Sequence, residues 1–241
     1  MLICKTIATG SSGNSYALMN DKEILLLDLG VSEKVIKKAI DFRISDVAGA
    51  VVSHGHLDHA KSVKDFENMG IKMFAPYNFS NHISAECNYM GDFKIKDFAL
   101  TDKNGKFMHT NNDGSECPCY GFLIEHEDMG KLLYITDTEL VKWRFSGINH
   151  ILISCNYQKK YISDSAKRNH VLRGHMELET VKDFIKANKS NTLRTVILCH
   201  MSSDSIDFLF AKKQIEEVVG RNVKVELATA GLETELNLTP F

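Results

Sequence analysis

The order of short apolar runs along the chain is the feature that most limits its fold. Runs of β type recur at residues 24–28, 49–53, 72–75, 93–98, 120–125, 132–136, 150–154, 195–199 and 223–228. Stretches with helical periodicity lie at 33–42, 61–69, 178–187 and 204–219, and Ser32 and Ser203 are expected helix starts. The chain is therefore expected to alternate strands and helices in part, but not throughout.

The middle of the chain, residues 93–136, is predicted to form consecutive strands, whereas both flanks alternate strand and helix. This mixed order favours two β-sheets packed face to face with helices outside, rather than a simple doubly wound sheet. The 241 residues contain no Gly/Ser-rich linker and no repeat, so we expect a single domain over residues 1–241.

Composition excludes few functions. A formal net charge of -2 argues against a protein that coats nucleic acid, but bound metal ions would add positive charge that a residue count misses. Six scattered cysteines indicate reduced thiols, and no apolar run is long enough for a signal peptide or a membrane span. We expect a cytoplasmic protein with no membrane partner, and nothing in the sequence indicates its oligomeric state.

A cluster of metal donors follows one of the apolar strands. In Ser53-His54-Gly55-His56-Leu57-Asp58-His59, four potential ligands fall within six residues. His54 and His56 point the same way in an extended segment, and Asp58 and His59 lie where the chain turns into the next helix. Imidazole and carboxylate donors without thiolates suit zinc, manganese or iron, so this segment predicts a site with one or two metal ions.

Three further donors stand near strand ends. Asp137 follows the run 131–136, His200 follows 195–199, and His109 precedes a polar loop. Each has an ordinary alternative, because Asp137 could cap a helix, His200 could be a buried core histidine and His109 could be a loop residue. Beside the first cluster, they would complete a set of seven ligands.

These residues together resemble the metallo-β-lactamase superfamily, whose signature is His-x-His-x-Asp-His followed by a distant His, a distant Asp and a final His. More narrowly, the chain resembles the small bacterial YycJ/WalJ-type exonuclease branch. The supporting segments are Ser11-Ser12-Gly13-Asn14-Ser15, His109 with Pro118 and Gly121, Tyr134-Ile135-Thr136-Asp137, Arg168 with Gly174-His175, and Leu198-Cys199-His200-Met201-Ser202.

The resemblance implies an α/β fold, an αββα sandwich of two mixed sheets, with two divalent metal ions (zinc or manganese) at one edge. It implies that His54, His56 and His109 hold one ion, that Asp58, His59 and His200 hold the other, and that Asp137 bridges both. The loop after His109 departs from the branch, because Thr110 follows the histidine and the loop is longer. Asp113 and Cys117 in this loop are therefore further candidate ligands.

The expected activity is that of a phosphodiesterase, most simply a DNA exonuclease, in which a hydroxide shared by two metal ions is the nucleophile. Asp58 would orient this hydroxide, and His175 would contact the phosphate or protonate the leaving oxygen. The substrate is expected to be nucleic acid or a nucleotide. Asn14 is expected at the rim, and Arg168, Arg173, Lys159 and Lys160 would offer positive charge to a nucleic-acid backbone.

Three other functions remain open on this sequence. A phosphodiesterase for cyclic nucleotides would use the same chemistry on a smaller substrate, and a thioester or lactone hydrolase would use the same scaffold. A non-catalytic interaction protein with a vestigial metal site is the alternative from a different class, against which the full ligand set speaks.

Overall fold

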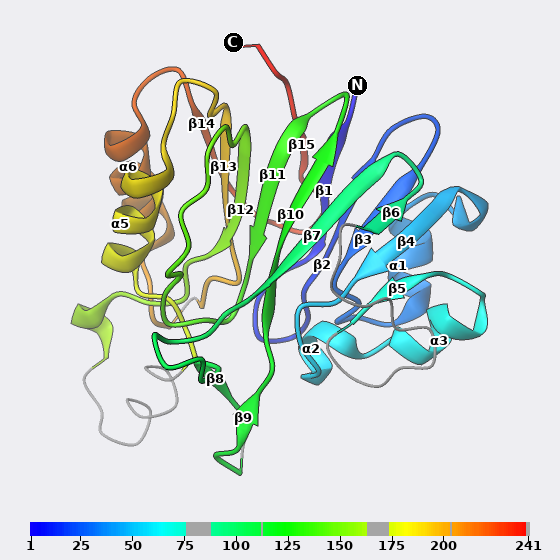
Figure 1. Cartoon of the computed structure of the whole chain (residues 1–241), viewed down its shortest axis with the longest axis horizontal. Helices are drawn as coiled ribbons and strands as arrows, with labels where there is room; N and C mark the ends of the chain where they lie inside the picture. The colour runs from blue at the N-terminus through cyan, green and yellow to red at the C-terminus, as the bar shows by residue number, and fades with distance from the viewer. Residues whose placement is uncertain (76–87, 112, 163–173, 203, 240–241) are drawn as a thin grey trace.

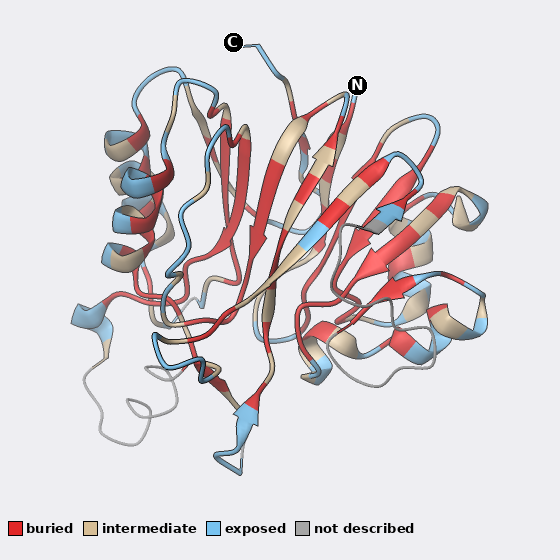
Figure 2. Cartoon of the chain, in the orientation of Figure 1, coloured by how far each residue is buried: buried red, intermediate tan, exposed pale blue. Residues whose placement is uncertain are grey.

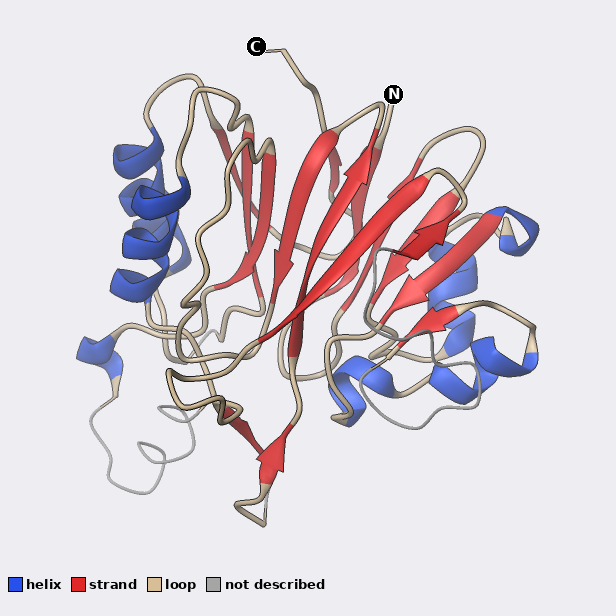
Figure 3. Cartoon of the chain, viewed as in Figure 1, coloured by secondary structure: helices blue, strands red, loops and turns tan. Residues whose placement is uncertain are grey.

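The computed structural model describes residues 1–75, 88–111, 113–162, 174–202 and 204–239. Within them, two large mixed sheets face each other and helices cover both outer faces (Figure 1, Figure 3). The α/β sandwich expected from the sequence is confirmed. The predicted helix start at Ser203, the cysteine Cys87 and the basic residues Arg168 and Arg173 lie outside the described residues.

The first sheet has the strand order β15-β1-β2-β3-β4-β5. Its strands β3, β4 and β5 are parallel, and the remaining pairs are antiparallel. In sheet order the bounds are Glu233–Glu235, Ile3–Ala8, Ser15–Met19, Ile24–Leu27, Val47–Val51 and Met73–Phe74.

The second sheet has the order β14-β13-β12-β11-β10-β7-β6. Strands β11 to β14 are parallel, whereas β6, β7, β10 and β11 pair antiparallel. In sheet order the bounds are Lys224–Leu227, Thr195–Cys199, His150–Ser154, Gly130–Ile135, Tyr120–His126, Phe93–Ala99 and Asn88–Met90. A separate pair, β8 (His109–Thr110) and β9 (Glu116–Cys117), lies beside the sandwich edge.

Alternation along the strands builds three apolar layers. Leu25 and Leu27 of β3 pack between the sheets with Tyr134 of β11, while Leu26 of β3 faces the opposite way. The outer layers are covered by α1 (Glu33–Ala39) and α3 (Val63–Asn68) on one side, and by α5 (Leu178–Asn188) and α6 (Phe208–Val219) on the other. Because helices and the opposite sheet cover both faces of each sheet, the central strands β3, β12 and β13 are buried along their whole length (Figure 2).

One expected helix start was wrong, and a short helix precedes another expected helix. The helix expected from residue 204 begins at Phe208, because the Asp207 side chain accepts a hydrogen bond from Phe210 N and caps the helix there. The helix expected over 61–69 is preceded by a separate short helix, α2 (Leu57–Ala60), which carries Asp58 and His59.

The five cysteines in the described part of the chain are free and buried. Cys4, Cys155 and Cys199 lie in the apolar layers, as expected for small core residues. Among the described residues, no helix has the length and apolar content needed to cross a membrane.

Candidate metal centre

The predicted donors gather at one edge of the sandwich because strands of both sheets end there. His54 and His56 follow β4, Asp137 follows β11 and His200 follows β13. His109 begins β8, the short strand near the lower edge in Figure 1. Carboxyl ends of parallel strands form a common edge in α/β folds, so these side chains meet although they lie far apart in the sequence.

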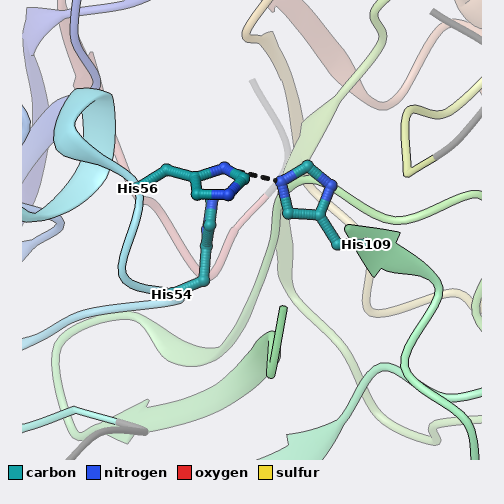
Figure 4. Close-up of side chains that lie close together, drawn as sticks. All are labelled: His54, His56 and His109. Carbon is teal, nitrogen blue, oxygen red and sulfur yellow. Dashed lines mark hydrogen bonds between the residues drawn. The ribbon is translucent and has the colours of Figure 1, made fainter. Parts of the chain in front are cut away.

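One group of three histidines, His54, His56 and His109, has ring nitrogens within 4.8 Å of one another (Figure 4). The ring centroids lie 4.6 to 4.7 Å apart, and His109 Nε2 is 3.0 Å from His56 Nδ1. His109 comes from the β8–β9 strand pair, which lies outside the two large sheets. The conformation of this loop therefore places the His109 ring beside those of His54 and His56.

The second group consists of Asp58, His59, Asp137 and His200, with donor atoms within 4.8 Å. Asp137 Oδ2 lies 3.1 Å from His59 Nε2 and 3.5 Å from His200 Nε2. The same oxygen lies 3.5 Å from His54 Nε2 in the first group. Asp137 therefore stands between the two groups, and the alternative of a helix cap is wrong, because residues 138–141 are not helical.

Two of these donors have a strained backbone. Asp137 and His200 have φ values of 39° and 49°, in the left-handed region that residues other than glycine rarely adopt. Both stand within two residues of the end of a buried strand, where this φ turns the chain abruptly. Strain of this kind persists only where the surroundings enforce it, and it concentrates at functional sites.

Two polar residues behind the donors, Asp28 and Asn156, were not predicted to support them. Asp28 Oδ2 lies 2.6 Å from His59 Nδ1 and accepts hydrogen bonds from Ser53 Oγ and Tyr134 Oη. Asn156 Nδ2 lies 3.1 Å from His200 Nδ1. Asp28 directly follows β3 and Asn156 stands two residues after β12, so the rule that located Asp137 and His200 could have located them.

Asn14 was expected at the rim of the site but is buried behind it. Its side-chain amide lies 3.2 Å from His59 Nε2 and bonds to the Gly10 carbonyl. Together Asn14 and Asp28 hold the His59 ring from two sides. A carboxylate that accepts from Nδ1 leaves the Nε2 lone pair of a neutral imidazole directed into the site.

Burial and neighbouring charges shift the pKa of the ionisable groups in the cluster. Burial lowers the pKa of His54, and burial lowers the pKa of His109 to about 4, so both rings are neutral donors near pH 7. Burial opposes a charge on His59, but the carboxylates of Asp28 and Asp137 raise its pKa well above the usual value. Despite burial, neighbouring histidines hold the pKa of Asp58 and Asp137 well below the ordinary range.

These features fit divalent cations. His54 Nε2 and His200 Nε2 are buried and lack a hydrogen-bond partner among the described residues, although both face Asp137. Unpaired buried nitrogens are costly in a structural core, whereas metal coordination would satisfy them. His59 Nδ1 faces Asp28 and Nε2 faces Asp137, and a metal ion bound at Nε2 would displace the proton that a charged His59 carries there.

The two groups open into a pocket of about 560 Å³. Its lining residues are Ser11, Gly55, His56, Leu57, Asp58, His109, Thr110, Asp137, Asn156, His175, His200, Ser202 and Ser205. The His175 ring lies 5.7 Å from the His109 ring and 6.2 Å from the His200 ring, so it borders both groups. A Cβ on the preceding Gly174 would lie 2.2 Å from His109 Nδ1, which explains the glycine at this position.

The other candidate ligands of the loop do not join the groups. Asp113 is exposed and accepts hydrogen bonds from Ser115. Cys117 is buried opposite His109 in the β8–β9 pair, and its hydrogen bond to His56 raises the pKa of that histidine. The described part of this loop therefore contributes His109 to the donor groups, with Cys117 as a neighbour of His56.

A third group of possible donors, Glu23, Asp92 and His126, lies elsewhere. We refer to it as the distal triad. Asp128 N donates to His126 Nδ1, so a neutral imidazole carries its proton on Nε2, which lies 3.2 Å from Glu23 Oε1. Glu23 Oε2 accepts from Asp92 N. Both imidazole nitrogens of His126 are therefore engaged, Nδ1 by the Asp128 N–H and Nε2 by Glu23.

Comparison with known proteins agrees with this geometry. A sequence profile described as the metallo-beta-lactamase superfamily matches residues 8–69. The exodeoxyribonuclease YycJ of Bacillus anthracis is 26% identical over 162 residues, which cover 59% of this chain and 56% of that relative. The exodeoxyribonuclease WalJ of Streptococcus pneumoniae is 23% identical over 258 positions, covering 94% of this chain and 88% of that relative.

A solved structure shows the same fold. The metallo-beta-lactamase fold protein YhfI from Bacillus subtilis superposes with a TM-score of 0.68 and 14% sequence identity, covering 98% of this chain and all of that one. The matched profile includes the His54–His59 segment, and the fold places the remaining donors around it. The chain therefore has the metallo-β-lactamase fold of metal-dependent hydrolases, and its sequence resembles the YycJ and WalJ exodeoxyribonucleases.

Proposed function

We propose that this protein is a dinuclear metal-dependent phosphodiesterase that cleaves nucleic acid as a DNA exonuclease. The observation that carries the proposal is the pair of donor groups joined by Asp137 at an open pocket. Two metal ions held close together are suited to in-line displacement at phosphorus. The similarity to relatives named exodeoxyribonucleases supports DNA as the substrate.

In this proposal His54, His56 and His109 hold one divalent ion, zinc or manganese, and Asp58, His59 and His200 hold the second. Asp137, whose Oδ2 lies 3.5 Å from His54 Nε2 and 3.1 Å from His59 Nε2, would contribute to both groups. When bound, the ions supply an activated water and neutralise charge on the phosphoryl oxygens. Asp28 keeps His59 in the tautomer that presents Nε2 to the site, and Asn156 orients His200.

Two residues face the substrate. Asp58 lines the pocket with a side chain that is 28% exposed, and its lowered pKa keeps it a carboxylate that can accept a hydrogen bond from the attacking water. His175 lines the same pocket and is partly exposed, so it can donate a proton to the leaving oxygen or contact the phosphate.

The experiment is a substrate panel on metal-loaded protein. It contains single- and double-stranded DNA, RNA, cyclic nucleotides, bis(p-nitrophenyl) phosphate and a thioester. Release of mononucleotides from DNA ends is expected, with Asp137→Ala as the control for contaminating nucleases. Preferred turnover of cyclic nucleotides or of the thioester would replace the exonuclease assignment with one of the alternatives.

The same panel tests His175. Replacement by Ala is expected to lower kcat on DNA roughly 100-fold, because positioned acid catalysis contributes at least that much, while bound metal stays unchanged. Unchanged turnover at full metal content would remove His175 from the mechanism.

A further inference from the structure

Next to the pocket lies an exposed surface that combines apolar and basic side chains. Tyr161 is 44% exposed, and Leu209 and Phe210 at the start of α6 are 76% and 41% exposed. Lys160 stands beside Tyr161 in the turn Lys159–Tyr161. We call Lys160, Tyr161, Leu209, Phe210 and the exposed Lys213 the basic–aromatic surface.

Lys160 joins the two segments of this surface. Its Nζ lies 4.8 Å from the Tyr161 ring centroid and 4.7 Å from the Phe210 ring centroid. The ammonium therefore contacts two aromatic rings that are far apart in the sequence, at distances typical of cation–π contacts. An anion drawn to Lys160 would be placed within reach of both rings.

The surface is held in a defined position beside the pocket. Gln158 N donates to Ser205 O at 2.8 Å, and Asp207 N donates to Gln158 Oε1 at 2.9 Å. The Asp207 side chain in turn caps α6 by accepting from Phe210 N. Because Ser205 lines the pocket, the chain that carries the rings continues directly from the pocket wall.

The charges of the surface are available to a ligand. Lys160 and Lys213 form no ion pair within the described parts of the chain, whereas the nearby Lys159 pairs with Glu177 at 3.9 Å. Lys213 lies three residues after Phe210, so the two share one side of α6. A substrate leaving the pocket across this wall would therefore meet two cations and two aromatic rings.

We infer that the basic–aromatic surface binds the single-stranded part of a nucleic-acid substrate as it leaves the pocket. Bases stack on aromatic rings only when their faces are exposed, and single strands expose them whereas paired duplexes do not. Phosphates that alternate with the bases would pair with Lys160 and Lys213. This inference rests on the proposed function and extends it by naming the strandedness of the substrate.

The test compares the double variant Tyr161→Ala/Phe210→Ala and the variant Lys160→Ala with wild type. The matched control is Lys38→Ala/Phe42→Ala, which removes an exposed lysine and a 70% exposed aromatic ring next to α1. Affinity is measured with a labelled, cleavage-resistant phosphorothioate oligothymidylate and with a phosphorothioate duplex. Steady-state kinetics use a cleavable single strand and bis(p-nitrophenyl) phosphate.

The double variant is expected to weaken single-strand binding roughly tenfold or more, the range for losing stacking on aromatic residues, and to raise KM on the cleavable strand by the same factor. Binding by Lys160→Ala should be weaker than wild type and less dependent on salt. Both variants should turn over bis(p-nitrophenyl) phosphate as fast as wild type. The control variant should bind and cleave the single strand as wild type does.

Unchanged single-strand affinity in the double variant would overturn the inference, as would equal losses for single strand and duplex. A wild-type dimer that Phe210→Ala converts to a monomer, measured by light scattering, would assign the surface to self-association instead. Wild type that binds the oligonucleotide through this surface but releases no nucleotide would refute the proposed function and leave the inference standing.

Discussion

The candidate metal centre and the distal triad contain the same kinds of side chain in different hydrogen-bond surroundings. Both combine histidine with carboxylates, and both contain buried members. His126 ends β10 opposite Gly130 at the start of β11, whereas Asp137 lies beyond the other end of β11. The two groups therefore occupy opposite ends of one strand pair.

The partners of the imidazole nitrogens distinguish the two groups. In the distal triad a backbone N–H occupies His126 Nδ1, and Glu23 lies beside Nε2. In the metal centre Nε2 of His54 and of His200 is buried without a hydrogen-bond partner, within the described part of the chain. Histidine and carboxylate content alone would predict two metal sites, and the buried Nε2 atoms of His54 and His200 distinguish the candidate metal centre from the distal triad.

The largest expected effect comes from Asp137→Asn. A neutral amide cannot hold two cations at once, so turnover should fall roughly 1000-fold or more and bound metal should decrease. His126→Gln should leave metal content and turnover at wild-type levels. Elemental analysis measures metal content, and a phosphodiester assay measures turnover. Loss of metal from the His126 variant and not from the Asp137 variant would place the metal in the distal triad instead.

A smaller effect is expected from Asp28→Asn. The amide would weaken the hydrogen bond that fixes the His59 tautomer, and changes to such outer partners cost about 10- to 100-fold in metal affinity. Competition with a chromophoric chelator measures the affinity. Glu23→Gln, which changes the carboxylate beside a histidine in the distal triad, is the matched control. Equal metal affinity in wild type and Asp28→Asn would show that Asp28 only stabilises the surrounding core and does not orient His59 for metal binding.

The last effect, on stability rather than on metal content or turnover, concerns a buried histidine outside both groups. His150 Nε2 lies 3.0 Å from the Met129 carbonyl oxygen, and burial lowers the pKa of His150 from 6.5 to about 4. Between these values the unfolded chain binds a proton that the folded protein does not. The free energy of unfolding should therefore fall as pH drops from about 6.5 to about 4, by at most roughly 3 kcal/mol from this residue.

His150→Gln removes this titration while keeping a donor for Met129. Denaturant unfolding of the metal-loaded wild type and variant, between pH 7 and pH 4, gives the difference attributable to His150. Identical pH profiles for the two proteins would contradict the prediction.

Much of the architecture could be predicted from sequence because buried central strands consist mainly of apolar residues. The strands 150–154 and 195–199 agree with the structure at both ends. β15, with the sequence Glu-Thr-Glu, was not predicted, because a short polar edge strand has no apolar pattern and depends on pairing with β1. The start of α6 was misplaced because its cap is Asp207, while the prediction began at residue 204.

The sequence located the candidate donors, which the structure gathers into two groups. His54, His56, Asp58 and His59 are adjacent in the chain, and each distant donor was sought near a strand end or loop. Tertiary structure alone decided three further matters: that His109 rather than Asp113 joins His54 and His56, that Asp28 and Asn156 orient the donors, and that His126 does not belong to them. The physical reason is that residue type limits which contacts are possible, whereas the partner of each nitrogen depends on backbone segments far apart in the sequence.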